Sequence, residues 1–329
     1  MKRENIIGRA NVEDTPQLEA YYRELEGEAL GALWTVANEI EPWYPQPKSV
    51  PTLWKWQRSE PFVRRAPDLV AADKAARRVV MLVNPGRKEW SAAAGLLYTG
   101  VQVMNPGEFT SAHRHQASAL RFVMEGRGAY TTVDGERMSL GARDLVLTPN
   151  GTWHDHGVEG GGTQCVWQDG LDIPLMNSLD ANFYEVHPDV VQKPAPLSRE
   201  NWNKPYSPQF QYSWDDAYRA LKKDGARHQY SNPLTGGPIM PTMGAQLELL
   251  RKGHATQSRR HTGSVIYQVA VGSGWSEING QRFEWQEKDI FALPSWALHR
   301  HGAHEEAVLF SFDDLPAMRA LGLYREADT

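Results

Sequence analysis

Three histidines have the types and spacing of a metal site. His113 and His115 flank Arg114, and residues two apart in a β-strand point to the same face, so both imidazoles should face one way. His154 follows a turn signal at Asn150-Gly151, on what reads as another strand, and could complete a facial set. Three neutral imidazoles leave open coordination positions, which a catalytic metal needs and a closed structural site lacks. We therefore predict a metal site formed by these three side chains.

Composition limits the class of protein. The 329 residues include 35 basic and 40 acidic side chains, a formal net charge of −5 without a basic block, which argues against binding nucleic acid or an anionic membrane. Cys165 is the only cysteine, so a disulfide within the chain, a zinc ribbon and a cysteine-ligated iron–sulfur cluster are excluded. No apolar run is long enough for a signal peptide core or a membrane span. We expect a soluble, cytoplasmic protein that acts on a small molecule.

The residues around the histidines predict β structure. From about residue 75 to 174, short β-branched and aromatic runs alternate with glycine turns at the regular spacing of an all-β sandwich or barrel. The same texture returns after residue 231. Gly107 to His115 and Gly253 to His261 span equal lengths, which indicates two copies of one β domain in matching register.

The first part of the chain has a different pattern. Apolar residues recur at roughly helical spacing over residues 18–34, with Thr15 and Pro16 suited to the cap and the first turn. The four prolines from Pro42 to Pro51 exclude a regular helix or a central strand. Because this segment is rich in tryptophan, we expect an ordered arm that wraps a neighbouring domain or subunit.

These patterns divide the chain into four parts. We expect an N-terminal helix with a Pro/Trp-rich arm (1–74), a first β domain with the metal site (75–175), a linker (176–231) and a second β domain (232–329). Within the linker, SWDDAYRALKKDG favours a short helix that ends at Gly225.

Two motifs carry a resemblance to known proteins. Gly107 through Gly126 and Pro149 through His154 resemble the two signature motifs of the cupin superfamily. The stretches AHRHQASALRFVMEGRGAYTTVDGE, LTPNGTWHDHG and WQDGLDIPL resemble the gentisate 1,2-dioxygenase family of ring-cleaving enzymes, which includes salicylate and 1-hydroxy-2-naphthoate dioxygenases. The likeness covers most of the chain.

The resemblance implies a fold, a cofactor and an assembly. The fold would be an all-β bicupin, two jelly-roll (double-stranded β-helix) barrels after an N-terminal helical segment and arm, and relatives assemble as homotetramers. Many cupins have a glutamate ligand four residues after the second histidine, where this chain has Ala119. The site thus keeps three histidines, the set that family members use for Fe(II), and we expect one Fe(II) per subunit in the N-terminal cupin.

Two further residues are expected to act on the substrate. Arg121 lies in an otherwise apolar run, and a buried arginine is costly without an anionic partner. It is expected to bind and orient the carboxylate of an aromatic acid, and an internal salt bridge is the alternative. His156, two residues after His154, resembles a pocket residue that acts as hydrogen-bond donor or acid/base; the alternative is that it only orients a metal ligand.

The resemblance also implies a set of pocket residues. One of Arg77 and Arg78 is expected near the substrate, which of the two is left open, and the other is expected to be a solvated charge. Tyr98 and Gly100 share a strand face and are expected to line the pocket, and a tyrosine there favours gentisate over salicylate. Asp169 could accept a hydrogen bond from the distal hydroxyl of the ring, or could be a turn residue beside Gly170.

The second copy has an altered site. Arg259, His261 and His299 occupy its equivalent positions, so a cation replaces one ligand. We expect no iron there and a role in packing and assembly. His301, the counterpart of His156, is expected to be a structural remnant.

The expected function is that of an Fe(II) dioxygenase. It would insert O₂ between the carboxyl-bearing and hydroxyl-bearing carbons of a 2-hydroxybenzoate, with gentisate favoured. Salicylate, a 5-substituted nitro- or halosalicylate and 1-hydroxy-2-naphthoate remain open, because Arg143 and Asn150-Gly151 depart from the usual motif close to His154. A Mn(II) decarboxylase or isomerase and a non-catalytic, ligand-binding bicupin are more distant alternatives.

Overall fold

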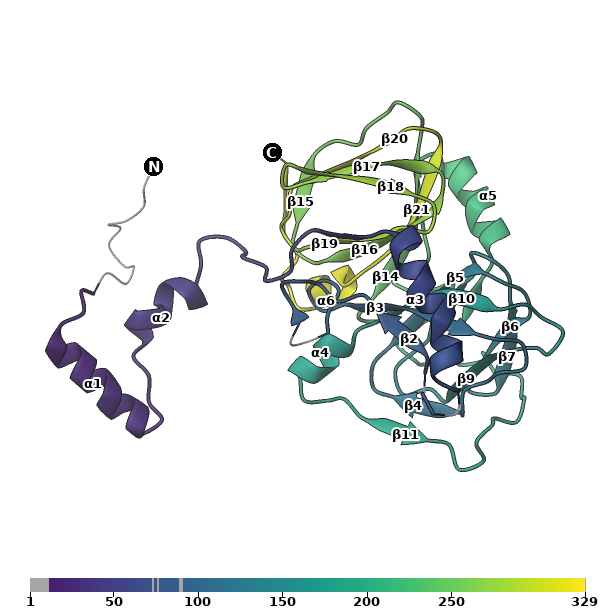
Figure 1. Cartoon of the computed structure of the whole chain (residues 1–329), viewed down its shortest axis with the longest axis horizontal. Helices are drawn as coiled ribbons and strands as arrows, with labels where there is room; N and C mark the ends of the chain where they lie inside the picture. The colour runs from purple at the N-terminus through teal and green to yellow at the C-terminus, as the bar shows by residue number, and fades with distance from the viewer. Residues whose placement is uncertain (1–11, 73, 76, 89–90, 329) are drawn as a thin grey trace. The chain divides into compact units, whose positions relative to one another are not determined.

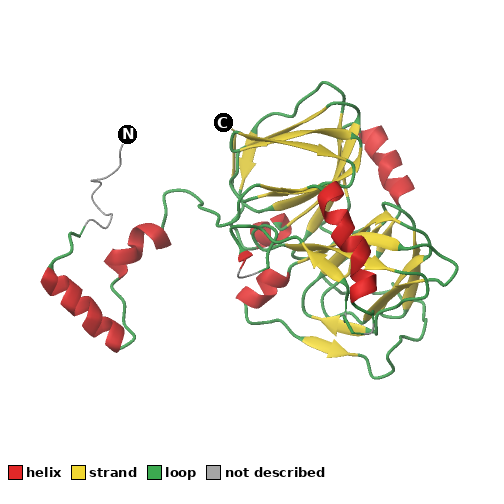
Figure 2. Ribbon diagram, viewed as in Figure 1, coloured by secondary structure: helices red, strands yellow, loops and turns green. Residues whose placement is uncertain are grey.

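The computed structural model describes residues 12–72, 74, 75, 77–88 and 91–328. The chain forms two units: one ends at Gln46 and the other runs from Pro47 onward. The second unit consists mainly of strands (Figure 2). In the described part of the chain, no helix has the length and apolar character needed to cross a membrane.

The first unit contains two helices, α1 (Pro16–Gly27) and α2 (Leu33–Ile40). Thr15 accepts a hydrogen bond from the Leu18 backbone N–H at 3.2 Å, which confirms the predicted cap. The sequence pattern predicted a single helix, but the chain breaks between the two helices, where Ala29 has a φ of 56°. Neither helix buries a residue. The apolar side chains of both helices therefore remain available for contacts outside this unit.

The second unit is built from two β barrels, each with two antiparallel sheets (Figure 1). The six-stranded sheet of the first barrel has the order β12 (Gln211–Tyr212), β8 (Leu145–Thr148), β5 (Ala119–Glu125), β10 (Cys165–Leu171), β3 (Tyr98–Met104) and β2 (Val79–Met81). The five-stranded sheet that faces it has the order β11 (Tyr184–Val186), β4 (His113–His115), β9 (His154–Val158), β6 (Ala129–Val133) and β7 (Glu136–Leu140).

The second barrel repeats this arrangement. Its six-stranded sheet has the order β1 (Thr52–Trp54), β19 (Ile290–Leu293), β16 (Val265–Val271), β21 (Ala307–Asp313), β14 (Gly244–Leu250) and β13 (Arg227–Gln229). Its five-stranded sheet has the order β18 (Gln281–Gln286), β17 (Ser273–Ile278), β20 (His299–Ala303), β15 (Arg259–His261) and β22 (Glu326–Asp328). The predicted internal repeat is therefore present strand for strand.

The two six-stranded sheets pack on each other through one hydrophobic core. Phe122 of β5 stacks on Phe310 of β21 with ring centroids 3.9 Å apart and an interplanar angle of 6°. A Cβ atom at Gly170 of β10 would lie 2.6 Å from the Phe312 ring, so this close approach requires glycine. Because one face of each sheet serves this shared core, the other face is free to line the interior of its own barrel.

The described residues of the second unit also form four helices. The helices are α3 (Trp56–Leu69), α4 (Ile173–Ser178), α5 (Trp214–Asp224) and α6 (Leu315–Ala320). The proline-rich segment before α3 contributes β1 only at the edge of a sheet, in agreement with the expectation that it forms no central strand. Helix α3 was not predicted from the sequence. Helix α5 was predicted, and it has Ser213 as its N-cap and Gly225, with φ of 88°, at its end.

Arg143 does not lie beside the metal site, contrary to expectation. With a φ of 66°, it occupies a turn between β7 and β8. Its Nε donates to the Ala270 carbonyl at 2.9 Å, and its guanidinium pairs with Glu287 at 2.8 Å. This residue therefore connects the first barrel to the second.

Candidate functional site

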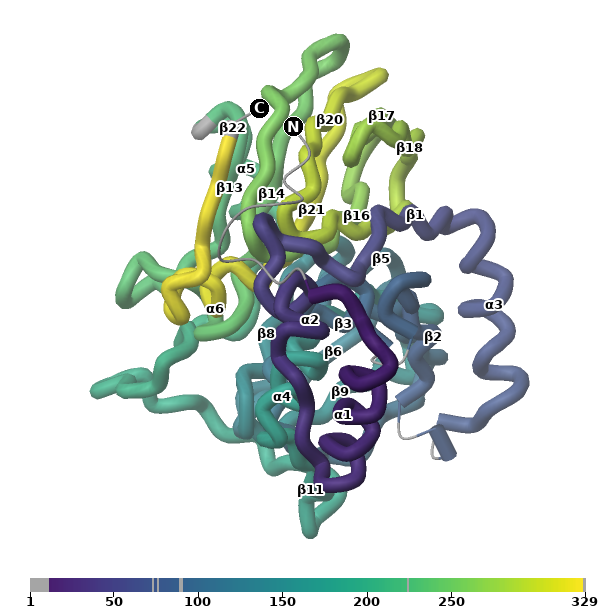
Figure 3. Tube along the Cα trace, turned by 90° about the vertical axis from the view of Figure 1, so that its left-hand side faces the viewer, coloured from purple at the N-terminus to yellow at the C-terminus, as the bar shows by residue number. Residues whose placement is uncertain are grey.

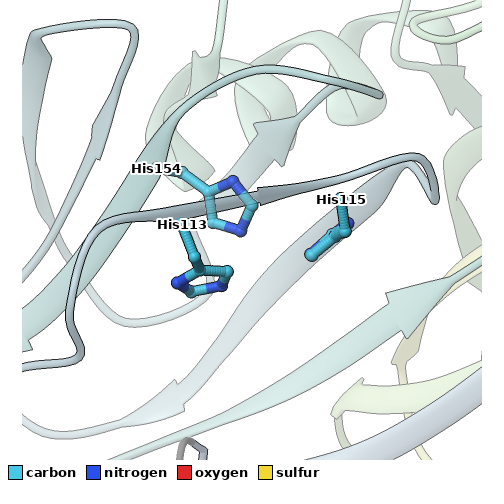
Figure 4. A group of neighbouring side chains, drawn as sticks. All are labelled: His113, His115 and His154. Atoms are coloured by element: carbon cyan, nitrogen blue, oxygen red, sulfur yellow. The ribbon is translucent and has the colours of Figure 1, made fainter. Parts of the chain in front are cut away.

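The three predicted ligands come together inside the first barrel. His113 and His115 lie on β4, and His113 is the direct cross-strand partner of His154 on β9. All three are buried, and one ring nitrogen of each lies within 4.8 Å of those of the other two. Figure 4 shows the three rings turned toward a common point. The period of two along β4 and the register with β9 produce this arrangement.

Hydrogen bonds select the nitrogen that each ring presents. The Nδ1 atoms of His113, His115 and His154 lie 2.7, 2.7 and 3.0 Å from the carbonyl oxygens of Ser111, Ala117 and Thr152. A carbonyl only accepts, so each Nδ1 carries the proton and each Nε2 presents a lone pair. All three Nε2 atoms are buried without a hydrogen-bond partner. Three orphaned lone pairs directed at one point fit a metal ion.

Burial keeps these rings neutral. Together with the positive charge of Arg77, it lowers the pKa of His113 to about 4 and that of His115 to about 3. The pKa of His154 is also held well below its usual value by burial. At neutral pH the site needs no deprotonation before it binds a metal.

His156 is the next residue on the same face of β9 and is fully buried. Its Nε2 lies 3.1 Å from the amide nitrogen of Gln102 on β3. With the amide as donor, the proton of the neutral ring is on Nδ1, which is buried without a partner. Gln102 was not predicted from the sequence, although it is two residues beyond Gly100 and therefore shares the face of the predicted pocket residues.

Arg121 and Asp169 are cross-strand partners on β5 and β10, and Gly100 on β3 is the other neighbour of Asp169. Arg121 Nε lies 3.4 Å from Asp169 Oδ1, and the two side chains are 2% and 6% exposed. The internal ion pair left open by the sequence is therefore present. Neither of these two atoms forms a hydrogen bond, so both keep bonding capacity.

A pocket of about 710 Å³ opens beside this pair. Its lining includes Arg77, Tyr98 and Asp169, three of the residues predicted to bind substrate. Burial and the charge of Asp169 raise the pKa of Tyr98 to about 12, so its phenol is neutral at pH 7. A Cβ atom at Gly100 would lie 3.1 Å from the Tyr98 hydroxyl oxygen and 2.4 Å from the Val79 side chain. Glycine thus gives Tyr98 room against the wall of the pocket.

The structure distinguishes the two adjacent arginines. Arg77 lines the pocket. Arg78 is 6% exposed, and its guanidinium pairs with Glu108 and donates to the Val103 carbonyl at 3.3 Å. The expectation that the arginine outside the pocket is solvated is wrong, because Arg78 is buried in a structural ion pair.

The second barrel places a cation where the first places a ligand. Arg259 is the cross-strand partner of His299, as His113 is of His154. Its Nε lies 3.4 Å from His299 Nε2 and so competes for the lone pair that a metal would need. Among the described residues, the histidines of the first barrel are the only group of three or more potential ligands close enough to hold an ion.

His301 should make the second barrel sensitive to acid. It is 1% exposed, its Nδ1 lies 2.8 Å from Ser276 Oγ, and burial lowers its pKa to about 3. An unfolded histidine has a pKa of about 6.5, so between these values only the unfolded chain binds the proton, and the free energy of unfolding falls as the pH falls. We expect His301→Gln to make this decline shallower, by at most about 1.4 kcal/mol per pH unit.

Urea unfolding between pH 7 and pH 4 measures this slope. Buried carboxyls with raised pKa values, such as Asp313 and Asp314, act in the opposite direction but are common to both proteins. Parallel curves for the wild type and the variant would contradict the assignment of a neutral, buried His301.

Fold and site together define a class of protein: a chain of two β barrels with a buried group of three histidines in the first barrel and a pocket lined by Arg77, Tyr98 and Asp169. The model of the cupin domain matches residues 100–174. Gentisate 1,2 dioxygenase 1 of Aquipseudomonas alcaligenes is 36% identical, over 95% of this chain and 97% of the relative. The 5-aminosalicylate 1,2-dioxygenase of a Comamonas species is 34% identical, over 94% and 90%.

Solved structures agree with these relatives. A tryptophan-to-tyrosine variant of the salicylate 1,2-dioxygenase from Pseudoaminobacter salicylatoxidans, in complex with gentisate, superposes with a TM-score of 0.91 at 32% identity and covers 99% of both chains. The chain belongs to the gentisate and salicylate 1,2-dioxygenase family of bicupin enzymes. It is a ring-cleaving dioxygenase and therefore an oxidoreductase.

Proposed function

We propose that this enzyme holds one Fe(II) per subunit, in the first barrel, and cleaves a 2-hydroxybenzoate between its carboxyl-bearing and hydroxyl-bearing carbons, with gentisate as the preferred substrate. The observation that carries the proposal is the set of three buried Nε2 lone pairs without partners. An all-nitrogen site with no carboxylate suits Fe(II) better than a hard Mn(II) ion. When bound, iron supplies a Lewis acid for the substrate oxygens and the electrons that activate O₂.

The two arginines supply the charge that an aromatic acid requires. Arg77 lines the pocket, and Arg121 lies deeper, where its charge acts on His154 and His156. A planar guanidinium can hold a carboxylate through two parallel hydrogen bonds. Because Arg121 Nε has no hydrogen-bond partner, we propose that Arg121 orients the substrate carboxylate and that Arg77 adds attraction at the entrance.

His156 is placed to donate a hydrogen bond and to transfer a proton. Its unpartnered Nδ1–H faces a buried environment, and Gln102 fixes the ring orientation. Burial holds its pKa well below the usual value, so the ring stays neutral until a negative charge arrives beside it. We propose that it donates a hydrogen bond to the substrate and moves a proton during cleavage.

Asp169 and Tyr98 form the wall that favours gentisate. Asp169 has a carboxylate oxygen without a hydrogen-bond partner, and Tyr98 lies in the same pocket. A second ring hydroxyl, which gentisate has and salicylate lacks, can satisfy that oxygen. Salicylate would leave this carboxylate oxygen unpaired, and a polar site discriminates against an analogue that leaves one of its buried groups without a partner.

Oxygen consumption tests the reaction and the substrate together. The protein is loaded with Fe(II) without air and mixed with gentisate, salicylate, 5-nitrosalicylate, 5-chlorosalicylate or 1-hydroxy-2-naphthoate, and O₂ uptake is recorded for each. We expect the highest kcat/KM with gentisate. No O₂ uptake with any 2-hydroxybenzoate would refute the proposed reaction. A higher kcat/KM with another of these compounds would refute only the proposed preference for gentisate.

Tyr98→Trp should shift the preference from gentisate toward salicylate. Indole is larger than phenol and removes the hydroxyl from the wall that includes Asp169, so the second ring hydroxyl loses its polar surroundings. We expect the ratio of kcat/KM for gentisate to that for salicylate to fall about 10-fold. The matched control is Tyr98→Phe, which removes the hydroxyl but keeps the space. An unchanged ratio in Tyr98→Trp would exclude this residue from substrate choice.

We also propose that the subunits assemble as a homotetramer and that the N-terminal unit contributes to assembly. Side chains of this unit are apolar but exposed, including Leu33 and Ile40, each 62% exposed. Exposed apolar groups of this kind are typical of protein interfaces. Light scattering of the full chain during size-exclusion chromatography measures the mass, and a monomer would contradict the proposal.

A further inference from the structure

The segment from Phe183 to Ala195 forms a strap across the sheet that carries the metal ligands. Its strand β11 is the edge strand next to β4, with Tyr184 opposite His115 and Val186 opposite His113. In Figures 1 and 3, β11 lies at the end of the first barrel that is farther from the second barrel. The strap thus forms one side of the strand that bears two of the three ligands.

The backbone of β4 depends on the strap. On its other side, β4 shares only one residue pair with β9, His113 with His154. The strap adds the β11 ladder and continues it, since the Ala112 N–H donates to the Val190 carbonyl at 2.6 Å and the His187 N–H donates to the Ala112 carbonyl at 2.8 Å. A three-residue strand with one pair on one side needs these bonds to keep its place.

Tyr184 reaches one of the ligands directly. Its ring stacks on His113 with centroids 5.4 Å apart and an interplanar angle of 25°. His154 contacts the same imidazole edge-on, with ring centroids 4.3 Å apart. The His113 ring is therefore held by stacking on Tyr184, by the T-shaped contact with His154 and by the hydrogen bond of its Nδ1. The tyrosine is the part of this support that comes from the strap.

The strap also contacts the strand of the third ligand. Gln192 donates to Asp155 Oδ2 at 2.8 Å, and His187 packs edge-on against Trp153 at 4.7 Å. Both contacts fall on residues adjacent to His154. The strap thus pairs with the strand of His113 and His115 and contacts both residues adjacent to His154.

The strap lies at the surface of the barrel. Tyr184 is 52% exposed and Val186 57% exposed, and β11 buries none of its residues. Segments with few buried contacts open locally at a smaller free-energy cost than the whole domain. Local opening of this exposed segment would remove the partner from one side of the ligand strand.

We propose that Tyr184 is a positioning residue that keeps His113 in its ligand orientation, so that the strap controls how slowly the metal leaves. This role rests on the proposed metal site. The positioning of metal ligands by neighbouring groups commonly changes metal affinity about 10- to 100-fold.

The second barrel offers a matched control. Its edge strand β22 pairs with β15 as β11 pairs with β4, and Tyr324 stacks on His261 with centroids 6.4 Å apart and an angle of 26°. There Arg259 replaces a ligand, so removing the tyrosine should not affect metal retention.

The test measures metal loss without substrate. Wild type, Tyr184→Ala, Tyr184→Leu, Tyr184→Phe and Tyr324→Ala are loaded with Co(II), whose absorption bands report its coordination, and then mixed with excess chelator. We expect dissociation to be about 10-fold faster in Tyr184→Ala and Tyr184→Leu, and unchanged in Tyr184→Phe, which keeps the stacked ring, and in Tyr324→Ala. The leucine variant keeps apolar bulk if alanine prevents folding, and thermal unfolding of the metal-free proteins should show no difference that parallels the rates.

Two outcomes overturn the inference and differ in what they mean. If the wild type retains Co(II) and both Tyr184→Ala and Tyr184→Leu lose it no faster, the role of Tyr184 is wrong and the metal site stands. If the wild type retains no Co(II) or Fe(II), the metal site fails, and the positioning role fails with it. Equal acceleration by Tyr324→Ala would also overturn the role, because it would reveal a general loss of stability.

Discussion

His113→Ala should remove the metal and ring cleavage together. The wild type is expected to hold one iron per chain, and the variant almost none, because only two imidazoles remain of a set in which one ring nitrogen of each lies within 4.8 Å of the others. His113 is also the cross-strand partner of His154, and His115 and His154 alone would hold a metal ion less tightly. Metal analysis after anaerobic loading with Fe(II) measures the first effect, and O₂ uptake with gentisate measures the second.

The internal repeat provides the control for this prediction. His261→Ala removes a buried histidine of the second barrel that lies beside Arg259. It should leave the iron content unchanged, since the second barrel is expected to hold no iron. Equal loss of iron in His113→Ala and His261→Ala would contradict the proposal of one metal site per chain.

Arg121→Met should lower kcat/KM for gentisate about 100- to 1000-fold, because truncating one partner of a buried charge pair costs about 2–5 kcal/mol of binding free energy. The guanidinium is 2% exposed, and its removal leaves the Asp169 carboxylate buried without its cation. A methionine of similar length preserves packing, so the loss is one of charge and hydrogen bonding. The remaining carboxylate would also repel the carboxylate of the substrate.

Asp169→Asn separates the two roles of Arg121. This variant removes the internal partner but keeps the cation for the substrate, so we expect a smaller loss with salicylate, which has no second hydroxyl, than Arg121→Met causes. Urea unfolding reports stability for both variants, since breaking a buried pair typically costs about 3–5 kcal/mol. If Arg121→Met is destabilised but retains the wild-type kcat/KM per folded molecule, Arg121 is structural and does not bind substrate.

Local patterns were the most predictable from sequence. The histidine pair of β4 shares a face because the side-chain period of a strand is two, and no tertiary contact can change that. The turn signal before His154, the cap at Thr15 and the end of α5 at Gly225 are also local and were found in the structure. The equal spacings of the repeat predicted two copies, because conserving strand register requires conserving length.

Other features depend on residues that are distant in the chain. Helix α3 contains Pro61 and Pro67, which weaken the helical pattern in its sequence. The helix contacts strands β2 and β3 of the first barrel, which lie farther along the chain. The strap has no distinctive sequence, and its role follows from pairing with β4. Arg78 was misjudged because its partner Glu108 lies 30 residues away.

The sequence by itself identified the three histidines as candidate ligands, gave the common strand face of His113 and His115, and indicated the duplication of the domain. Tertiary structure alone decided that Arg121 meets Asp169, that Gln102 orients His156, that Arg77 rather than Arg78 lines the pocket, and that Tyr184 covers His113. The physical reason is that residue type and strand phase are properties of a few neighbouring positions. Which strands pair, and in which register, is set by the packing of the whole barrel.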